Sequence, residues 1–241
     1  MGKKRLSSIL EYISLRSKVA DIGSDHGFIP IELAKRGYPC PIATEVLPGP
    51  FKQCAANLAR FGVNVDLRFG SGLVPIRPGE VDIVVIAGMS GQTIAHILSE
   101  SWSKVGSFDQ YIFQPMLGSG CLRKFLFEKN LGMIKEWVIY ERNTFYQYIA
   151  VIPQRIGIPP ALHEAYSTID SEFLLEVGPR LLLNRDHITH QFLRSQECKQ
   201  NHVLKRINKT THPKRYHEVC IVLDQWKQVV DCHMKLLDSC K

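Results

Sequence analysis

An acidic, glycine-containing run near the N-terminus combines residue types that could bind a small ligand and act on it. The run follows a β-rich stretch, spans Asp21–Gly27 and reads D-I-G-S-D-H-G. Glycine lets the backbone turn sharply and approach a ligand closely. A dinucleotide-binding loop has glycine where Asp21 stands, and a carboxylate there repels a pyrophosphate but attracts a cation. The run therefore favours a cofactor of the methionine-sulfonium type over a nucleotide phosphate.

Three further segments have small or polar residues at the ends of β-rich runs: Glu45–Val46, Ser71–Gly72 and Gly88–Met89. Glu45 lies 18 residues beyond Gly27, and a carboxylate there can accept hydrogen bonds from both hydroxyls of a ribose. Because ligands bind outside the carboxyl ends of parallel strands, we expect these segments to meet in one crevice, although tight turns alone would also account for the glycines. The residues predicted to bind S-adenosyl-L-methionine are Asp21, Ile22, Gly23, Ser24, Glu45, Val46, Ser71, Gly72, Gly88 and Met89.

The elements that must position these residues alternate along the first part of the chain. The hydrophobic pattern predicts strands at 18–23, 41–46, 64–70, 81–88, 109–115, 133–141 and 145–153. Helical patterns occupy 30–37, 51–62 and 122–129, and an amphipathic first helix begins near Leu6. Alternating strands and helices imply an α/β fold, with a mostly parallel seven-stranded sheet covered by helices and closed by an antiparallel pair. This is the outline of the Rossmann-like class I methyltransferase fold.

The pattern changes after Pro153. The stretch 154–164 is a plausible linker because Pro159 and Pro160 cannot lie inside a helix. A long helical pattern follows over 171–207, with a kink expected at Gly178–Pro179, and a second pattern covers 215–237. Two helices joined by a short turn predict an antiparallel, coiled-coil-like hairpin. We therefore divide the chain into domains 1–155 and 156–241.

Charge and cysteine usage restrict the functional class. From Arg185 to Lys241 there are eleven Lys or Arg against six Asp or Glu, a net +5, and six of the nine histidines lie there too. Such a segment attracts polyanions, although a solvated helix face would look the same. Seven cysteines without a C-x-x-C pair indicate reduced thiols rather than disulfides or a zinc site. We expect a cytoplasmic, monomeric protein without a metal or a membrane segment.

Several motifs together resemble those of bacterial tRNA (adenine-22-N1)-methyltransferases. They are ADIGSDHGFIP, the acidic TEV of the second strand, IAGMSG followed by TIAHIL, and FQP at the end of the fifth strand. The resemblance covers most of the first 153 residues, and a helical C-terminal domain also fits the family. It implies an S-adenosylmethionine-dependent enzyme that forms 1-methyladenosine at tRNA position 22, with a tail that helps to hold tRNA.

The chain departs from the family pattern at three places. Ser71 stands where the family usually has aspartate in G-D-G, and Ser90 stands where it has glycine in G-M-G-G. Met116 stands where the family usually has asparagine in Q-P-N. The first change puts a contact to the cofactor adenine in doubt, and the last removes an amide that could face the target base. Because Asp21, Asp25 and Glu45 are all present, a diverged enzyme is favoured over an inactive one.

The chemistry of adenine suggests how the remaining residues act. The target base must leave its stack to expose N1, and its methylation puts positive charge on the ring. We predict that Asp25 is the catalytic residue, orienting the base and stabilising that charge, although it could instead cap the following helix. The predicted substrate-binding residues are His26, Phe28, Gln114, Pro115 and Tyr146, of which the histidine and aromatics could also be structural.

Three alternatives remain open from the sequence. One is a diverged methyltransferase fold that binds tRNA without methylating it. The second is a nicotinamide-dependent oxidoreductase, which the absent G-x-G-x-x-G motif disfavours. The third is a methyltransferase acting on another RNA or on a small molecule, and the basic C-terminal segment argues against the small molecule.

Overall fold

The computed structural model of the chain describes residues 2–157 and 159–238. The chain forms two compact units, Met1–Ile156 and Gly157–Lys241, and each is described by itself. Cys240, and with it the end of the predicted domain 156–241, lies outside the described residues. The first unit holds the predicted sheet and the second is helical, so the predicted fold class is confirmed.

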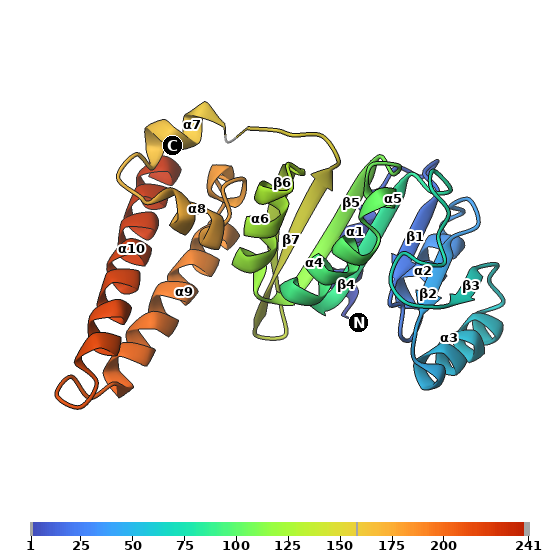
Figure 1. The fold of residues 1–241 in the computed structure, drawn as a ribbon, viewed down its shortest axis with the longest axis horizontal. Helices are drawn as coiled ribbons and strands as arrows, with labels where there is room; N and C mark the ends of the chain where they lie inside the picture. Colours follow the sequence, from blue (N-terminus) through green and yellow to red (C-terminus); the bar gives the residue numbers. More distant parts are fainter. Residues whose placement is uncertain (1, 158, 239–241) are drawn as a thin grey trace. The chain divides into compact units, whose positions relative to one another are not determined.

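The first unit is built on one seven-stranded sheet with the order β3-β2-β1-β4-β5-β7-β6 (Figure 1). β5 and β6 each pair antiparallel with β7, and the other neighbouring strands pair parallel, so β7 alone runs against the rest. The strands are β1 (Val19–Ile22), β2 (Ile42–Glu45), β3 (Asp66–Phe69), β4 (Ile83–Ser90), β5 (Gln110–Leu117), β6 (Gly132–Glu141) and β7 (Thr144–Ile152). Consequently β1 to β5 all end at the same edge of the sheet, and most of the predicted binding residues lie near these strand ends or just beyond them.

The helices of this unit pack against the sheet and against one another. They are α1 (Lys3–Leu10), α2 (Phe28–Lys35), α3 (Pro48–Phe61), α4 (Gly91–Glu100), α5 (Trp102–Val105) and α6 (Ser119–Glu128). α1 and α2 cover one face, where Leu10 and Leu33 pack with strand residues such as Val85, Ile112 and Tyr148. α3 begins at Pro48, earlier than its hydrophobic pattern indicates, because proline is well suited to the first turn. α4 and α5 were not among the predicted helices.

The second unit is a helical assembly whose main feature is a hairpin of two long helices. α9 (His187–Arg206) and α10 (Pro213–Asp238) pack side by side, preceded by α7 (Pro160–Ala165), α8 (Ser171–Val177) and the short 3-10 helix η1 (Leu181–Leu183) (Figure 1). Helical spacing in this pattern predicts six core positions for α10. Five of them are buried, namely Val219, Leu223, Trp226, Val229 and Val230, whereas Val222 is only half-buried. The ring of Trp226 contacts that of Phe173 on α8 in an edge-on arrangement.

Two expectations for this region were wrong. The pattern over 171–207 is not one kinked helix, because Gly178 adopts φ 120° and ψ 99° and ends α8, and Asp186 then caps a separate helix α9. The predicted linker is also shorter than expected, since Pro160 is the first residue of α7 and its missing N–H costs nothing there.

Two of the C-terminal histidines do not add to the positive surface. His233 is fully buried, and burial lowers its pKa below the ordinary value. The neighbouring His190 stacks against it with ring centroids 5.6 Å apart, and burial lowers its pKa as well. Within residues 2–157 and 159–238, no helix is both long and apolar enough to cross a membrane.

Candidate functional site

The loop between β1 and α2 is held in a conformation that glycine favours. Gly23, Asp25 and Gly27 all have positive φ, at 71°, 49° and 72°. An L-residue such as Asp25 rarely adopts this conformation, so its side chain is retained there at a cost in backbone strain. α2 is preceded by Gly27 and receives no side-chain cap, which means that Asp25 does not cap it. The carboxylate is instead about two-thirds exposed, with Oδ2 at 3.6 Å from Nε2 of His26.

Glu45 ties this loop to the end of β2. Its side chain is buried, and Oε2 accepts a hydrogen bond of 3.1 Å from the amide of Asp25. Oε1 accepts two more, of 2.8 Å from the amide of Val46 and 3.0 Å from that of Leu47. A carboxylate has about four acceptor positions, so Glu45 can still take a hydroxyl donor from a ligand. It therefore organises the site as well as offering an acceptor.

Asp21 lies beneath the loop and is almost completely buried. Removal from water raises the pKa of its carboxyl to about 7, and the nearby negative charge of Glu45 adds to the increase. Ser24 is buried beside it and donates a hydrogen bond to the carbonyl of Asp21. A cationic group placed near this carboxyl would lower its pKa, because that group would stabilise the charged form.

A cavity of about 270 Å³ lies at this edge of the sheet. Its lining includes seven of the predicted residues, and it adds four that were not predicted. The predicted ones are Asp21, Gly23, Ser24, Asp25, His26, Phe28 and Gly88, and the others are Arg5, Ile29, Ala87 and Met116. Phe28 is 41% exposed, and its ring centroid is 5.5 Å from that of His26. Phe28 is therefore a wall of the cavity rather than a core residue.

β4 bends where it meets the cavity. Its pairing with β5 shifts register between Ala87 and Met89, and Gly88 adopts φ 83°. A Cβ at Gly88 would find no atom within 4 Å, so the backbone there faces open space that a ligand could fill. Gly23 is different, because a Cβ there would collide with the Met89 side chain. The β1 loop thus needs glycine at this position for its conformation, since the flexible end of the Met89 side chain is able to move aside.

Arg5 is the residue of the site that sequence reasoning missed. Its Nη2 donates to Oε1 of the buried Gln114 at 2.6 Å and approaches Sδ of Met116 at 3.6 Å. The guanidinium carbon lies 4.3 Å from the centre of the Tyr146 ring. Gln114 and Tyr146, two of the predicted residues, do not line the cavity themselves. They contact Arg5, which does. In the sequence Arg5 reads only as one charge of a basic N-terminus, and no local signal places it at the end of β5.

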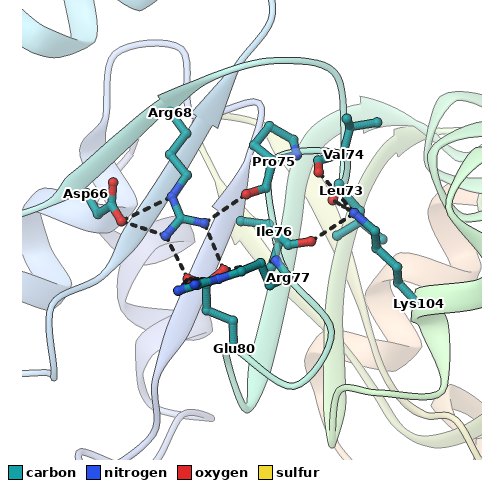
Figure 2. Close-up of polar contacts among 9 residues, drawn as sticks. All are labelled: Asp66, Arg68, Leu73, Val74, Pro75, Ile76, Arg77, Glu80 and Lys104. Carbon is teal, nitrogen blue, oxygen red and sulfur yellow. Dashed lines mark hydrogen bonds and ion pairs between the residues drawn. The ribbon is translucent and has the colours of Figure 1, made fainter.

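The loop after β3 carries Ser71 and Gly72 and is fixed from several sides (Figure 2). Gly70 donates its amide to the Glu45 carbonyl, and Thr44 Oγ1 donates to the carbonyl of Gly72. Within the described part of the chain, the amides of Ser71, Gly72 and Leu73 donate to no protein acceptor. Three successive backbone donors therefore follow Gly70, whose own amide is bonded to the Glu45 carbonyl.

The other predicted residues occupy varied surroundings. The Ile22 side chain is buried in the sheet, and Pro115 is buried where β5 pairs with Met89. Val46 is 48% exposed next to Glu45. Ser90, a departure from the family pattern, caps α4 by accepting a hydrogen bond of 3.1 Å from the Thr93 amide. Met116 has a thioether where the family usually has the amide of asparagine. Its Sδ accepts a hydrogen bond of 3.5 Å from Nε2 of Gln114.

Comparison with known proteins gives consistent matches. A family model described as a methyltransferase domain matches residues 2–149. The tRNA (adenine(22)-N(1))-methyltransferase of Bacillus subtilis is 32% identical over 188 residues, which cover 77% of this chain and 76% of the relative. The crystal structure of the B. subtilis m1A22 tRNA methyltransferase TrmK has a TM-score of 0.79 and 25% identity, covering 95% of this chain and 99% of that one.

A further match contains a ligand. The structure of M. capricolum TrmK in complex with S-adenosyl-homocysteine, its natural cofactor product, has a TM-score of 0.77 and 22% identity. It covers 96% of this chain and 99% of that one, and at this identity it supports the likeness of fold.

Burial of Asp21 predicts a pH dependence of stability. The unfolded chain ionises this acid near its ordinary value of 3.8, whereas the folded chain does so at about 7. Between these values the folded state holds the extra proton, so the free energy of unfolding falls as pH rises. Relative to Asp21→Asn, the wild type should lose about 2.5 kcal/mol between roughly pH 5 and 7.5. Urea unfolding across this range measures the difference, and parallel pH profiles would contradict the burial effect.

Proposed function

The chain belongs to the tRNA (adenine(22)-N(1))-methyltransferase family, and we propose that it transfers a methyl group from S-adenosyl-L-methionine to N1 of adenine 22 in tRNA. The observation that carries the proposal is the arrangement of the cavity at the carboxyl edge. It combines a buried acid, an exposed acid on a strained loop, and glycine backbone open to a ligand. Sulfonium methylation of a base needs alignment and charge stabilisation more than it needs a nucleophile from the protein.

The residues present fit the cofactor. The open space in front of Gly88 admits a ligand against the backbone, and a cation bound near Asp21 would stabilise the ionised form of this buried carboxyl. Glu45 has one acceptor position left for a ribose hydroxyl, and the amides of Ser71 and Gly72 have no protein acceptor within the described chain. S-adenosyl-L-methionine, when bound, supplies an electrophilic methyl group. Asp21, Gly23, Ser24, Gly88 and Met89 would line its methionine end, and Glu45, Val46, Ser71 and Gly72 its nucleoside end.

Asp25 is the residue we assign to the target base. Its amide is held by Glu45 while its carboxylate faces the cavity, so the backbone is fixed independently of the side chain. The carboxylate would accept a hydrogen bond from the adenine N6 amino group and stabilise the positive charge that develops on the ring. No proton has to leave, because the methylated base can carry the charge. Phe28 would stack on the unstacked base, and His26 would orient Asp25.

Arg5 organises the other wall of the cavity. Its bond to Gln114 and its position over Tyr146 keep the end of β5 and α1 together. The guanidinium is a cation, so it would repel the developing charge on the base if it lay close to N1. We therefore assign Arg5 to a phosphate of the flipped nucleotide, for which its planar donors are suited.

The α9–α10 hairpin supplies the surface that we propose for tRNA. Residues 198–217, which we call the hairpin tip, contain six Lys or Arg and no Asp or Glu. These cations are all exposed: Lys199, Lys205, Arg206, Lys209, Lys214 and Arg215. Arg215 pairs with Glu218, just beyond the tip, at 3.3 Å. A concentrated positive end on a rigid hairpin fits a phosphate backbone. We also propose a cytoplasmic location, as tRNA modification would require.

The activity is tested with full-length protein, labelled cofactor and unmodified tRNA transcripts. We expect one methyl group at adenine 22 and none on a transcript with guanine at that position. Asp25→Asn should slow methyl transfer about a hundredfold or more, because the base loses an electrostatic partner in the transition state. Asp109→Asn, an exposed acid at the opposite edge of the sheet, is the matched control.

Binding measurements separate this role from a structural one. S-adenosyl-homocysteine and tRNA should bind Asp25→Asn with nearly unchanged affinity. A near wild-type rate in this variant would refute the role of Asp25. Cofactor and tRNA binding without any methylation by the wild type would instead favour the binding-only alternative.

The hairpin tip is tested by removing two charges. Lys205→Gln with Lys209→Gln should weaken tRNA binding and lower the salt slope by roughly 0.7 to 0.9 for each phosphate that the protein no longer neutralises. Lys227→Gln with Lys235→Gln removes the same charge elsewhere on α10 and should change binding little. Equally weakened binding in the two double variants would mean that overall charge matters and the tip does not.

A further inference from the structure

Two cationic side chains, those of Lys104 and Arg68, hold the backbone that follows Ser71 and Gly72, and we call this pair the clasp. Four successive carbonyls, those of Leu73, Val74, Pro75 and Ile76, each accept a hydrogen bond from a Lys or Arg side chain (Figure 2). The side chains of Leu73 and Ile76 are fully buried, while Val74 is 63% exposed. The segment is therefore anchored on its inner side and presents its outer side at the carboxyl edge.

Lys104 provides three of the four bonds. Its Nζ lies 3.1 Å from the Leu73 carbonyl oxygen, 3.0 Å from that of Val74 and 2.9 Å from that of Ile76. An ammonium has three N–H donors, and here each can point at a different carbonyl. Lys104 lies on α5, about thirty residues further along the chain, so the contact joins two elements that are distant in sequence.

Arg68 completes the clasp from the other side. Its Nη1 donates to the Pro75 carbonyl at 2.8 Å, and its two Nη atoms also bond the Glu80 carboxylate at 2.8 Å each. Glu80 in turn accepts from the Arg77 amide at 2.9 Å. This charged cluster fixes where the segment ends, whereas Lys104 fixes the turn immediately after Gly72.

We propose that Lys104 is a positioning residue for the nucleoside end of the cofactor, acting through the loop Gly70–Ile76. The carbonyls from Ser71 to Ile76 are all satisfied by the protein, through Val74 N, Thr44 Oγ1, Lys104 and Arg68. The amides of Ser71, Gly72 and Leu73 are not, within the described chain, so the loop is prepared to donate and not to accept. Adenine offers ring nitrogens as acceptors at its edge, which suits such a loop.

This inference rests on the proposed function and concerns affinity rather than chemistry. A loop that must be closed to bind has an apparent dissociation constant equal to the intrinsic one divided by the closed fraction. If removal of the Lys104 ammonium leaves the loop closed about a tenth of the time, the Kd for cofactor rises about tenfold. The rate at saturating cofactor does not change, since bound cofactor closes the loop.

The test uses the full-length chain with Lys104→Met, which keeps an apolar stem and removes the three donors. Calorimetry with S-adenosyl-homocysteine should show a Kd about tenfold higher, and kinetics should show a higher KM for the cofactor with unchanged kcat. Hydrogen exchange should become faster at the bonded amides of Gly70, Val74 and Ile76 and stay slow in β1 and β4, and saturating S-adenosyl-homocysteine should restore the protection. Lys104→Arg should recover part of the affinity.

Lys35→Met, an exposed lysine at the far end of α2, is the matched control and should leave the Kd and KM unchanged. An unchanged Kd in Lys104→Met would overturn the proposal, and so would faster exchange across the whole sheet. If Lys104→Met fails to fold, Lys104→Gln is measured in the same way and should give a smaller rise in Kd. Binding of S-adenosyl-homocysteine is independent of tRNA, so a wild type that binds it but does not methylate adenine 22 would refute the function and leave this inference intact.

Discussion

The site depends on one buried carboxylate, that of Glu45, which accepts hydrogen bonds from three backbone amides. The amide of Asp25 belongs to the loop after β1, and those of Val46 and Leu47 to the loop after β2. A hydrogen bond to a charged group contributes about 1.5 to 3 kcal/mol. The bond from the Asp25 amide therefore offsets the cost of a backbone conformation that an L-residue disfavours, and the other two bonds fix the carboxylate that accepts it. The backbone of the exposed Asp25 is thus held in place by Glu45, a residue that does not itself line the cavity.

The other loops at the carboxyl edge of the sheet are held in a similar way. The parallel strands bring three loops to one edge, and each loop is held by side chains from elsewhere in the chain: the β1 loop by Glu45, the β3 loop by Lys104 and Arg68, and the end of β5 by Arg5. Preorganised donors and acceptors are effective because they need little rearrangement when charge develops. The departures from the family pattern are compatible with this arrangement, because Ser90 caps a helix and Met116 still contacts Arg5 and Gln114.

Much of the fold could be predicted from the sequence because its signals are local. Strand periodicity and the turn residues after each strand indicated the seven strands, and Gly62 ends α3 in the left-handed conformation that glycine favours. The single kinked helix over 171–207 was wrong because the periodic pattern continues across Gly178, whereas the backbone does not. Arg5 and Lys104 could not be predicted, since each acts on groups about thirty or more residues away and lies in a segment without a motif.

The affinity of Glu45→Gln for S-adenosyl-homocysteine shows whether Glu45 organises the cofactor edge. The amide of glutamine loses the charge and turns a donor toward backbone amides that need acceptors. Calorimetry should show binding weaker by about thirtyfold or more, equivalent to about 2 kcal/mol, with Glu32→Gln on the surface of α2 as the control. Affinity for S-adenosyl-homocysteine equal to that of the wild type would mean that Glu45 does not organise this edge.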